Sequence, residues 1–482
     1  MDPKELRAAL HQVADLVADY LETVEERPVL PATHPGELLG ELPPAAPEQA
    51  ESLDQVLADY RQLIEPKLTH WNHPGFLAYF SSSGSGPGIL GELLAAGTAV
   101  NAMLWQTSPA ATELEVRVCD WLRQLVGLPA GFAGHINDTA SISTFLAIAA
   151  ARHEKVPELR HQGLAARPEV PALTVYASEQ RHSSIDKAMV ALGLGLDQLR
   201  LVPGDDAFRL DPQALAEQIA ADRAAGRRPI AVVATVGTTS STSADPVEAI
   251  AAICRREQLW LHVDAAWAGS IAICPEFRHH FAGWEAADSI VVNPHKWLFV
   301  PMDCSVLLVR DLERLRAAFS LVPEYLRTAD QRVDAAAGER PLQLMDLGVQ
   351  LGRRFRALKL WMVIRLFGAE GLRAKLREHV RLGQLLAQLI DADPHFERMA
   401  PTPFSTVCFR ALRPGASEAE LESFNETLLA AANHGGPYFL SHTKLRGRYV
   451  LRLAISNLRT EERHVRGVWK RLQEQAAALR DA

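Results

Sequence analysis

Two apolar runs, each followed by a residue with a reactive side chain, set the architecture of this chain: LWLHVDAAWAG at residues 259–269 and SIVVNPHKW at residues 289–297. Asp264 follows the apolar part of the first run, and Lys296 follows that of the second. Their length and β-branched content are typical of buried strands. Further strand-like runs lie at 173–177, 199–202, 230–235 and 305–309, with helical patterns at 183–192, 211–225 and 246–258. This alternation predicts an α/β fold with a mostly parallel central sheet flanked by helices.

The regions before and after this alternation have a different character. Apolar residues from Leu6 to Val24 recur at spacings of three and four and predict a helix. This helix is followed by a proline-rich extended arm (27–47) and by a second helix (53–64). Beyond residue 368 the expected elements are a helix, two strands and a last helix, at 372–390, 406–411, 449–455 and from 461. We therefore expect an N-terminal helical segment (1–85), a large α/β domain (86–367) and a smaller C-terminal α+β domain (368–482). The N-terminal helices need a partner surface, and their pattern leaves open whether a second subunit provides it.

Composition narrows the class of protein. The 482 residues include 50 Lys plus Arg and 58 Asp plus Glu, which gives a net charge of −8. The sequence has no run of basic residues that could bind along a phosphate backbone, so nucleic acid is not an expected partner. The N-terminus lacks the apolar core of a signal peptide, and no apolar stretch has the length of a membrane span. Five cysteines form neither CxxC pairs nor a metal-binding pattern with histidine: Cys119, Cys254, Cys274, Cys304 and Cys408. A soluble cytoplasmic protein without a metal site is expected.

Asp264 and Lys296 suggest a cofactor site. Ligands of open α/β sheets bind at the carboxyl ends of the strands, where both residues lie. Pyridoxal phosphate needs a lysine for its Schiff base and a carboxylate that keeps its pyridine nitrogen protonated. His182 follows the strand at 173–177, where its ring can stack on such a cofactor, and NDTASIST at 137–144 offers hydroxyl and backbone N–H groups for a phosphate at a helix start.

Each of these residues also has an ordinary structural explanation. A strand-end aspartate, a lysine that reaches water, a histidine in a first helical turn and an N-cap all occur without a cofactor. A nicotinamide cofactor is disfavoured, because GSGPG at 84–88 has Ile89 where the dinucleotide fingerprint needs its third glycine.

Seven motifs extend the pattern over nearly the whole chain. They are HWNHPGFLAYF (70–80), SPAATELE (108–115), EQRHSS (179–184), HVDAAWAG (262–269), NPHKW (293–297), LGRRFRALKLW (351–361) and YVLRLAISN (449–457). In these residues and in their order the chain resembles the pyridoxal-dependent group II amino-acid decarboxylases, most closely the aromatic-L-amino-acid branch. The resemblance implies a fold-type I pyridoxal-phosphate enzyme that forms a homodimer, with its N-terminal helices packed across the two-fold axis.

The resemblance also assigns roles to individual residues. It implies that Lys296 carries the cofactor, that Asp264 pairs with the pyridine nitrogen and that His182 stacks on the ring near the substrate carboxylate. Other predicted cofactor contacts are Ala140, Ser141, Asn293 and His295 around the phosphate, Thr239 in a turn, and Ala266 against the ring. The predicted surroundings of the substrate side chain are Trp71, Phe80, Ser82 and Gly352, with Asn101 to Met103 from the partner subunit.

The segment at 323–350 lacks clear periodicity and is expected to be a mobile loop. Tyr325 matches the loop tyrosine that in this family serves protonation of the carbanion after CO₂ leaves. The stretch TADQRVDAAAGERP (328–341) makes this loop longer than in animal relatives, and Asn72 and Met103 replace a histidine and an aromatic residue found there near the substrate. Gly352 leaves space for an indole as well as a phenol.

The leading hypothesis is decarboxylation of an aromatic L-amino acid, such as Phe, Tyr, DOPA, Trp or 5-hydroxytryptophan, to the amine, with protonation through Tyr325 or His182. Alternatives are decarboxylation of a non-aromatic amino acid, oxygen-dependent aldehyde synthesis, transamination and a non-catalytic binding homologue. Relatives that use oxygen tend to have lost the loop tyrosine or the stacking histidine, whereas Tyr325 and His182 are both present here.

Overall fold

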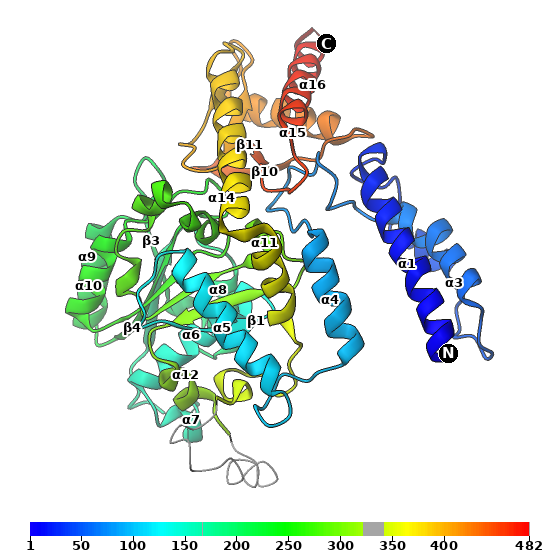
Figure 1. The fold of residues 1–482 in the computed structure, drawn as a ribbon. Helices are drawn as coiled ribbons and strands as arrows, with labels where there is room; N and C mark the ends of the chain where they lie inside the picture. Colours follow the sequence, from blue (N-terminus) through cyan, green and yellow to red (C-terminus); the bar gives the residue numbers. More distant parts are fainter. Residues whose placement is uncertain (166, 322–341, 482) are drawn as a thin grey trace. The chain divides into compact units, whose positions relative to one another are not determined.

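The computed structural model describes residues 1–165, 167–321 and 342–481 (Figure 1). They form two compact units: a sheet unit, comprising Ser82–Gln384 and Ala400–Val407, and a terminal unit, comprising Met1–Ser81, Leu385–Met399 and Cys408–Ala482. Most of the predicted loop at 323–350, Tyr325 included, lies outside the described residues. The three-part division at 1–85, 86–367 and 368–482 stays a prediction.

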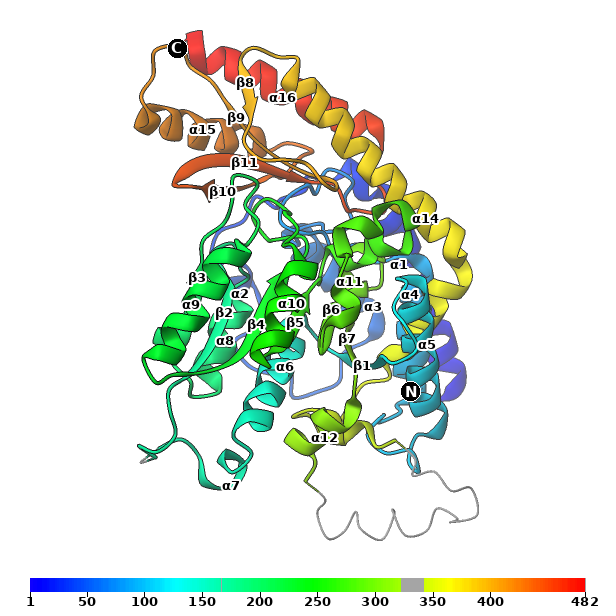
Figure 2. The ribbon, with the colours of Figure 1, turned by 90° about the vertical axis from the view of Figure 1, so that its left-hand side faces the viewer.

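The sheet unit is built on seven strands whose order is β1-β7-β6-β5-β4-β2-β3 (Figure 2). They are β1 (Ala133–Asn137), β2 (Leu173–Ser178), β3 (Leu199–Val202), β4 (Arg228–Thr235), β5 (Trp260–Asp264), β6 (Ser289–Val292) and β7 (Ser305–Val309). β7 is antiparallel to β1 and β6, and the pairs from β3 to β6 are parallel. The predicted fold class is confirmed, and six of these strands lie within two residues of their predicted bounds.

Helices surround this sheet. They are α4 (Gly86–Thr98), α5 (Pro109–Leu125), α6 (Ala140–Lys155), α7 (Leu159–Gln162), α8 (Ser184–Ala191), α9 (Pro212–Ala224), α10 (Val247–Glu257), α11 (Pro294–Trp297), α12 (Leu312–Phe319) and most of α14 (Arg356–Asp391). α6 packs against strands β4 to β7 and against α8 and α12. Its residues 147–151 are four alanines and an isoleucine, all at most 3% exposed, and their small side chains let the helix lie close to the sheet. This close packing fixes the start of α6 beside the ends of the strands.

The terminal unit combines the N-terminal helices with a four-stranded sheet of order β10-β11-β9-β8. Its elements include α1 (Pro3–Thr23), α2 (Glu37–Glu41), α3 (Leu53–Asp59), β8 (Phe396–Arg398), β9 (Thr406–Ala411), α15 (Glu418–Asn433), β10 (Ser441–Leu445), β11 (Arg448–Ala454) and α16 (Glu462–Asp481). A capping box starts α1, in which Asp2 accepts from the Glu5 N–H at 2.9 Å and the Glu5 carboxylate accepts from the Asp2 N–H at 2.7 Å. Among the described residues, no helix is both long and apolar enough to cross a membrane.

One expectation about the N-terminal region needs correction. The arm at 27–47 is not extended throughout, because α2 interrupts it: Gly36, at φ 90°, reverses the chain before α2, and the Glu37 carboxylate accepts the N–H of His34 at 3.1 Å. The helix predicted at 372–390 agrees with the second of two helical pieces of α14 (Arg356–Asp391), which meet at a kink where Gly368 has a non-helical φ of 66°. The first piece, before Gly368, was not predicted.

Candidate active site

The carboxyl ends of β4, β5 and β6 lie level at one edge of the sheet. Thr235 of β4 pairs in register with Asp264 of β5, and Asp264 pairs with Val291 of β6. Asp264 is buried, at 5% exposure, and its carboxylate accepts the N–H of Ala266 at 3.1 Å. One strand further, β6 leads through Asn293 into the short helix α11, which carries Lys296. Asp264 therefore ends one strand, and Lys296 follows the strand beside it.

His182 joins them from the turn after β2. Burial is the main cause that lowers its pKa, the Asp264 carboxylate acts to raise it, and the Lys296 ammonium acts to lower it further. The three side chains are thus close enough to influence one another. The structure brings together the residues predicted to be the cofactor lysine, the pyridine partner and the stacking imidazole.

Polar groups suited to a phosphate lie at the same edge. β1 ends at Asn137, and α6 begins at Ala140 and Ser141, so the outward N–H groups of its first turn face the region after the strand. Asn137 Nδ2 donates to Ser143 Oγ at 3.1 Å, and Ser143 Oγ lies 3.0 Å from Ser305 Oγ at the start of β7. This hydroxyl and amide chain holds the β1–α6 turn against β7.

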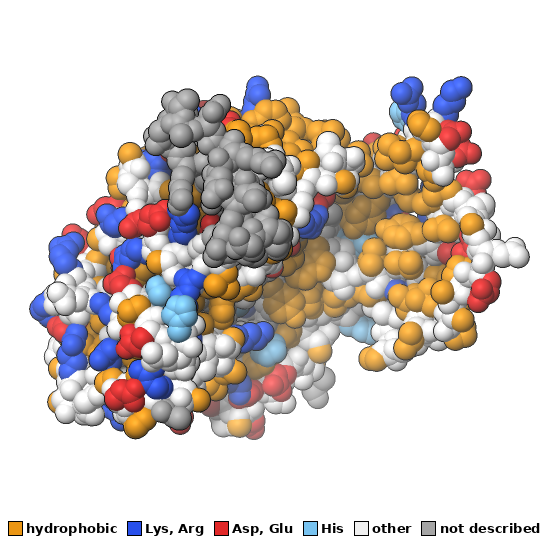
Figure 3. Space-filling view, turned by 90° about the horizontal axis from the view of Figure 1, so that it is seen from below, with side chains coloured by type: hydrophobic (Ala, Val, Ile, Leu, Met, Phe, Trp, Pro, Cys, Tyr) orange, Lys and Arg blue, Asp and Glu red, His pale blue; other side chains and the backbone are white. Residues whose placement is uncertain are grey.

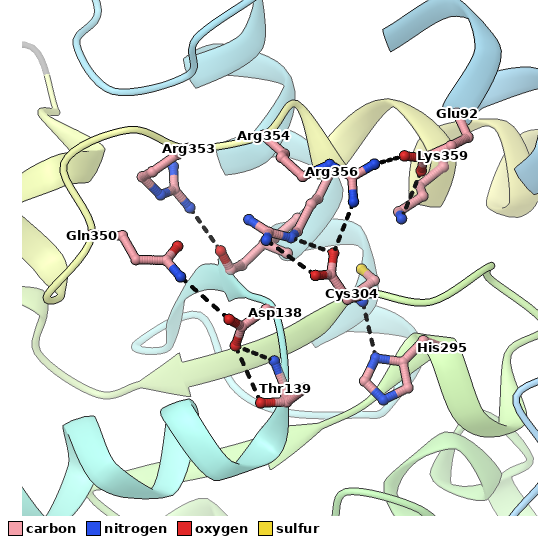
Figure 4. A network of polar contacts seen from close by, with 12 residues as sticks. Glu92, Asp138, Thr139, His295, Cys304, Gln350, Arg353, Arg354, Arg356 and Lys359 are labelled. Carbon is pink, nitrogen blue, oxygen red and sulfur yellow. Dashed lines mark hydrogen bonds and ion pairs between the residues drawn. The ribbon is translucent and has the colours of Figure 1, made fainter. Parts of the chain in front are cut away.

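His295 and Asn293 form a second polar pair in α11 and just before it. The Cys304 N–H donates to His295 Nδ1 at 2.9 Å, and burial lowers the pKa of His295 to about 3, so the ring is neutral with its proton on Nε2 (Figure 4). Asn293 Nδ2 lies 3.3 Å from that Nε2, while the buried Asn293 Oδ1 has no hydrogen-bond partner among the described residues. Exchange of the two ends of the Asn293 amide lets Oδ1 accept from Nε2 and turns Nδ2 outward as a donor.

Arginines of the LGRRF motif tie several site segments together (Figure 4). The Arg353 guanidinium is buried and donates to the Glu115 carboxylate and to the Ile136 carbonyl, both at 2.7 Å, and to the Ala102 carbonyl at 3.1 Å. The Arg353 N–H donates to Asn101 Oδ1 at 2.9 Å. Arg353 therefore fixes both β1 and the segment around residue 102.

A second ionic group lies beside it. Arg356 donates to the Asp303 carboxylate at 2.7 Å, and Lys359, 1% exposed, lies 2.7 Å from the Glu92 carboxylate. Arg354 also pairs with Glu92. Burial lowers the pKa of Lys359 to about 8. These pairs connect α4, the start of α14 and the residues that precede β7.

Other predicted site residues lie near these segments. In the turn after β4, Thr239 is exposed, whereas Thr238 is buried and lies 2.9 Å from Ser243 Oγ. Ala266 is buried after Asp264. Gly352 lies next to Arg353, and apart from its chain neighbours a Cβ there would have, among the described residues, only Asn101 Nδ2 within 4 Å, at 3.8 Å. Asn101 Nδ2 contacts Met103 Sδ at 3.4 Å, so Gly352 and the 101–103 segment form one group within the chain.

The remaining predicted substrate residues divide between the units. Ser82 is half-buried at the start of the sheet unit. In the terminal unit, Trp71 stacks on Phe76 with ring centroids 4.2 Å apart, and the Arg452 guanidinium lies over the Phe80 ring, 4.4 Å from its centroid. Arg452 also donates to the Tyr79 carbonyl at 2.5 Å.

The family is settled by comparison with known proteins. The family model described as the pyridoxal-dependent decarboxylase conserved domain matches residues 35–412. The chain belongs to the pyridoxal-dependent decarboxylases. Phenylacetaldehyde synthase of Arabidopsis thaliana is 42% identical over 99% of this decarboxylase and 97% of its own length, and tyrosine decarboxylase 2 of Narcissus pseudonarcissus is 40% identical over 99% and 95%. A crystal structure of Oryza sativa TDC with PLP and tryptamine has a TM-score of 0.94, with 38% identity and 99% coverage of both chains. The predicted family, its carboxy-lyase chemistry and its pyridoxal phosphate cofactor are confirmed.

The residues of this decarboxylase fit that cofactor. The Asn293 amide, turned so that its Oδ1 accepts from the neutral His295, and the start of α6 provide N–H donors for a phosphate. Asp264 and Lys296 provide the carboxylate and amine that the ring needs. What sequence reasoning missed is the support behind these groups, namely Arg353, Glu115 and Ser184, although all three belong to motifs already recognised.

Proposed function

We propose that this decarboxylase converts an aromatic L-amino acid to the corresponding amine and CO₂. The observation that carries the proposal is the convergence of Lys296, Asp264 and His182 at one edge of the sheet. Relatives at about 40% identity over nearly the full chain are a tyrosine decarboxylase and a tryptophan decarboxylase. Both act on rings of the kind that the predicted aromatic residues Trp71 and Phe80 accommodate.

The chain's own residues have distinct tasks in this reaction. Bound pyridoxal phosphate supplies a cationic ring that accepts the electron pair of the bond to the departing carboxylate. Lys296 would hold the cofactor covalently until substrate replaces it, and Asp264 would keep the proton on the ring nitrogen. His182 would orient the substrate carboxylate so that the bond between Cα and the carboxyl carbon breaks. The proton that replaces CO₂ at Cα would come through Tyr325 or His182.

Cofactor contacts complete this proposal. Asn293, His295, Ala140 and Ser141 would hold the phosphate, while Ala266 and the turn of Thr239 would border the ring. The side chain of Ala266 is small and buried, which suits a flat ring that lies against it. The low pKa of His295 keeps its imidazole a neutral hydrogen-bond donor.

The substrate side chain would lie among Trp71, Phe80, Ser82, Gly352 and Met103. The open space around Gly352 supports acceptance of an indole as well as a phenol. Because Gly352 and the 101–103 segment form one group, both would be contributed by the same subunit.

A homodimer is the proposed assembly. Leu6, Leu10 and Val13 of α1 are 40–49% exposed, and Leu90, Leu93 and Leu94 of α4 are 50–51% exposed. Apolar side chains also gather on the face of the molecule in Figure 3. Aliphatic clusters of this kind mark association surfaces, and a second copy of the chain is the occupant that the family resemblance implies. A cytoplasmic location is part of the same proposal.

One experiment tests the reaction. Purified, cofactor-loaded protein is incubated in air with Phe, Tyr, DOPA, Trp, 5-hydroxytryptophan, glutamate and 2,4-diaminobutyrate, while CO₂, amine, aldehyde, ammonia and peroxide are followed together. The expected result is amine and CO₂ in equal amounts from an aromatic acid, without peroxide. Lys296→Ala should lose both turnover and the absorbance band of the bound cofactor, whereas Lys470→Ala, at an exposed lysine, should keep both.

The main alternative is oxygen-dependent aldehyde synthesis, which the 42% identical phenylacetaldehyde synthase favours. Aldehyde formed together with peroxide and ammonia would replace the amine proposal with this one. Turnover of only the non-aromatic acids would overturn the aromatic specificity and leave the decarboxylase assignment in place.

A further inference from the structure

Two donors from one residue converge on the same nitrogen of His182. The backbone N–H of Ser184 donates to His182 Nδ1 at 3.1 Å, and Ser184 Oγ lies 2.9 Å from the same atom. Ser184 begins α8 and is 1% exposed. The contact is local, spans two residues and is partly buried.

This geometry determines where the imidazole proton is. A backbone N–H can donate only to an unprotonated ring nitrogen, so Nδ1 presents its lone pair. The neutral ring must then carry its proton on Nε2, and the Ser184 hydroxyl acts as a second donor to Nδ1. In the imidazolium form an N–H at Nδ1 would oppose the N–H of Ser184, so the backbone bond would be lost, whereas the hydroxyl could rotate to accept from Nδ1.

We propose that Ser184 is a positioning residue whose backbone N–H keeps His182 neutral with its proton on Nε2, so that His182 serves the substrate carboxylate as a hydrogen-bond donor. This inference rests on the proposed function, since it assigns the substrate carboxylate as the acceptor. In this role His182 holds the leaving group in place and does not transfer a proton from an imidazolium. A substrate carboxylate and an Nε2–H form a charge-assisted hydrogen bond, which is stronger than a neutral one.

The charges around His182 oppose one another. Asp264 from β5 and Asp186 from α8 favour the imidazolium, while Lys296 from α11 and Lys187 from α8 disfavour it. Burial disfavours the charged ring as well and is the largest influence on its pKa. Because these carboxylates and ammonium groups act in opposite directions, the backbone hydrogen bond at Nδ1 adds to burial in keeping the ring neutral.

The first test is the pH dependence of kcat/KM in Ser184→Pro, which removes the backbone N–H at the first position of α8, where proline is favoured. Ser184→Ala, which keeps this N–H, is the matched control. Without the N–H the imidazolium no longer loses a bond at Nδ1, so the pKa of His182 rises and the acid limb of the profile should move up by about half to one pH unit. An unmoved limb in Ser184→Pro, or an equal upward shift in both variants, would overturn the role of the Ser184 N–H.

A second pair of variants tests the tautomer. The side-chain amide nitrogen of Gln reaches the place of Nε2, whereas that of Asn reaches only the place of Nδ1. His182→Gln should therefore retain about tenfold more kcat/KM than His182→Asn, since a charge-assisted hydrogen bond is worth on the order of a factor of ten or more. Equal activity of the two variants, or higher activity of His182→Asn, would contradict the Nε2–H assignment.

A third readout does not depend on turnover. Long-range ¹H–¹⁵N correlation spectra of histidine-labelled holoenzyme, with the His182 signal identified by its absence in His182→Gln, report directly which ring nitrogen carries the proton. A proton on Nε2 alone is expected at neutral pH. A proton on Nδ1, or on both nitrogens, would overturn the inference even if decarboxylation is confirmed. If no aromatic acid is turned over but the Nε2–H tautomer is observed, the proposed function fails, and with it the role of His182 toward the substrate, while the part of Ser184 in fixing the tautomer stands.

Discussion

Glu115→Gln tests how strongly the site depends on one buried charge. The side chains of Glu115 and Arg353 are 1% and 2% exposed, and their atoms Oε1 and Nη2 lie 2.7 Å apart. Gln keeps the size of Glu but leaves the guanidinium as a buried charge without its counterion. Removal of one partner of a buried pair costs about 3–5 kcal/mol. Because Arg353 keeps the carbonyls of Ala102 and Ile136 as acceptors, the lower end, about 3 kcal/mol, is expected.

The assay is urea unfolding of the cofactor-loaded protein at one fixed protein concentration, followed by tryptophan fluorescence. Fixed concentrations keep the contributions of cofactor and subunit association equal for all variants. Glu378→Gln is the matched control, because Glu378 pairs with Arg381 at 2.7 Å but their side chains are 43% and 51% exposed. An exposed pair of this kind contributes about 0.2–1 kcal/mol.

The contrast between the two substitutions is the critical result. A loss for Glu115→Gln no larger than that for Glu378→Gln would refute the reasoning that burial makes the first pair indispensable. Glu115 also accepts the Ile136 N–H at 3.0 Å and so helps to hold β1, which leads to the predicted phosphate contacts at Ala140. Glu115→Gln should therefore also release pyridoxal phosphate more readily on dialysis. If Glu115→Gln retained as much pyridoxal phosphate as Glu378→Gln, the buried pair would stabilise the fold without supporting cofactor binding.

Three further predictions concern packing, pH and the substrate side. Gly91→Ala places a methyl carbon 2.5 Å from the backbone of α14 and should lower the Tm. Gly97→Ala in the same helix is the control: its methyl carbon meets no atom of the described residues within 4 Å, so the Tm should stay the same or rise. A hydrogen bond from Arg463 is the main cause that lowers the pKa of Glu25 to about 2, so ionised Glu25 contributes a small amount to the free energy of unfolding. Glu25→Gln should remove this contribution, so the difference between the two proteins should be present above about pH 5 and shrink as the pH falls toward 2. Urea midpoints of both proteins across that range would show it. Arg452→Lys loses the guanidinium over the predicted substrate-side ring and should raise KM for an aromatic acid severalfold without change in cofactor affinity; a lower kcat at unchanged KM would contradict this.

The strands β2 to β7 were predictable because each is a short apolar run with turn signals on both sides. The strand β1 was not, since AGHIN contains one strongly apolar residue, Ile136, and its place in the sheet depends on Glu115 and Arg353, which are far apart in the sequence. The direction of β7 is likewise invisible in its apolar run, because parallel and antiparallel buried strands show the same pattern.

The candidate site divides in a similar way. Asp264, Lys296, His182 and the helix start at 137–144 could be found from strand ends and cofactor chemistry, and the remaining roles came from family resemblance. The support behind them could not be found so easily: the buried pair of Glu115 and Arg353 joins residues that the sequence gives no reason to connect. Ser184 is different, because a serine two residues after a histidine at a helix start is a local signal that sequence reasoning could have used.

The place of β1 in the sheet has a consequence for the order of assembly during synthesis. β1 is an edge strand whose one neighbour in the sheet is β7, and about 170 residues separate Asn137 from Ser305. At roughly 5–20 residues per second, the ribosome needs about 10–30 s to make the partner after β1 has emerged. Until then β1 has no partner strand, and the predicted phosphate end of the site, which follows β1 directly, has no sheet behind it. Cofactor capture is therefore expected to be a late event in the life of the nascent chain.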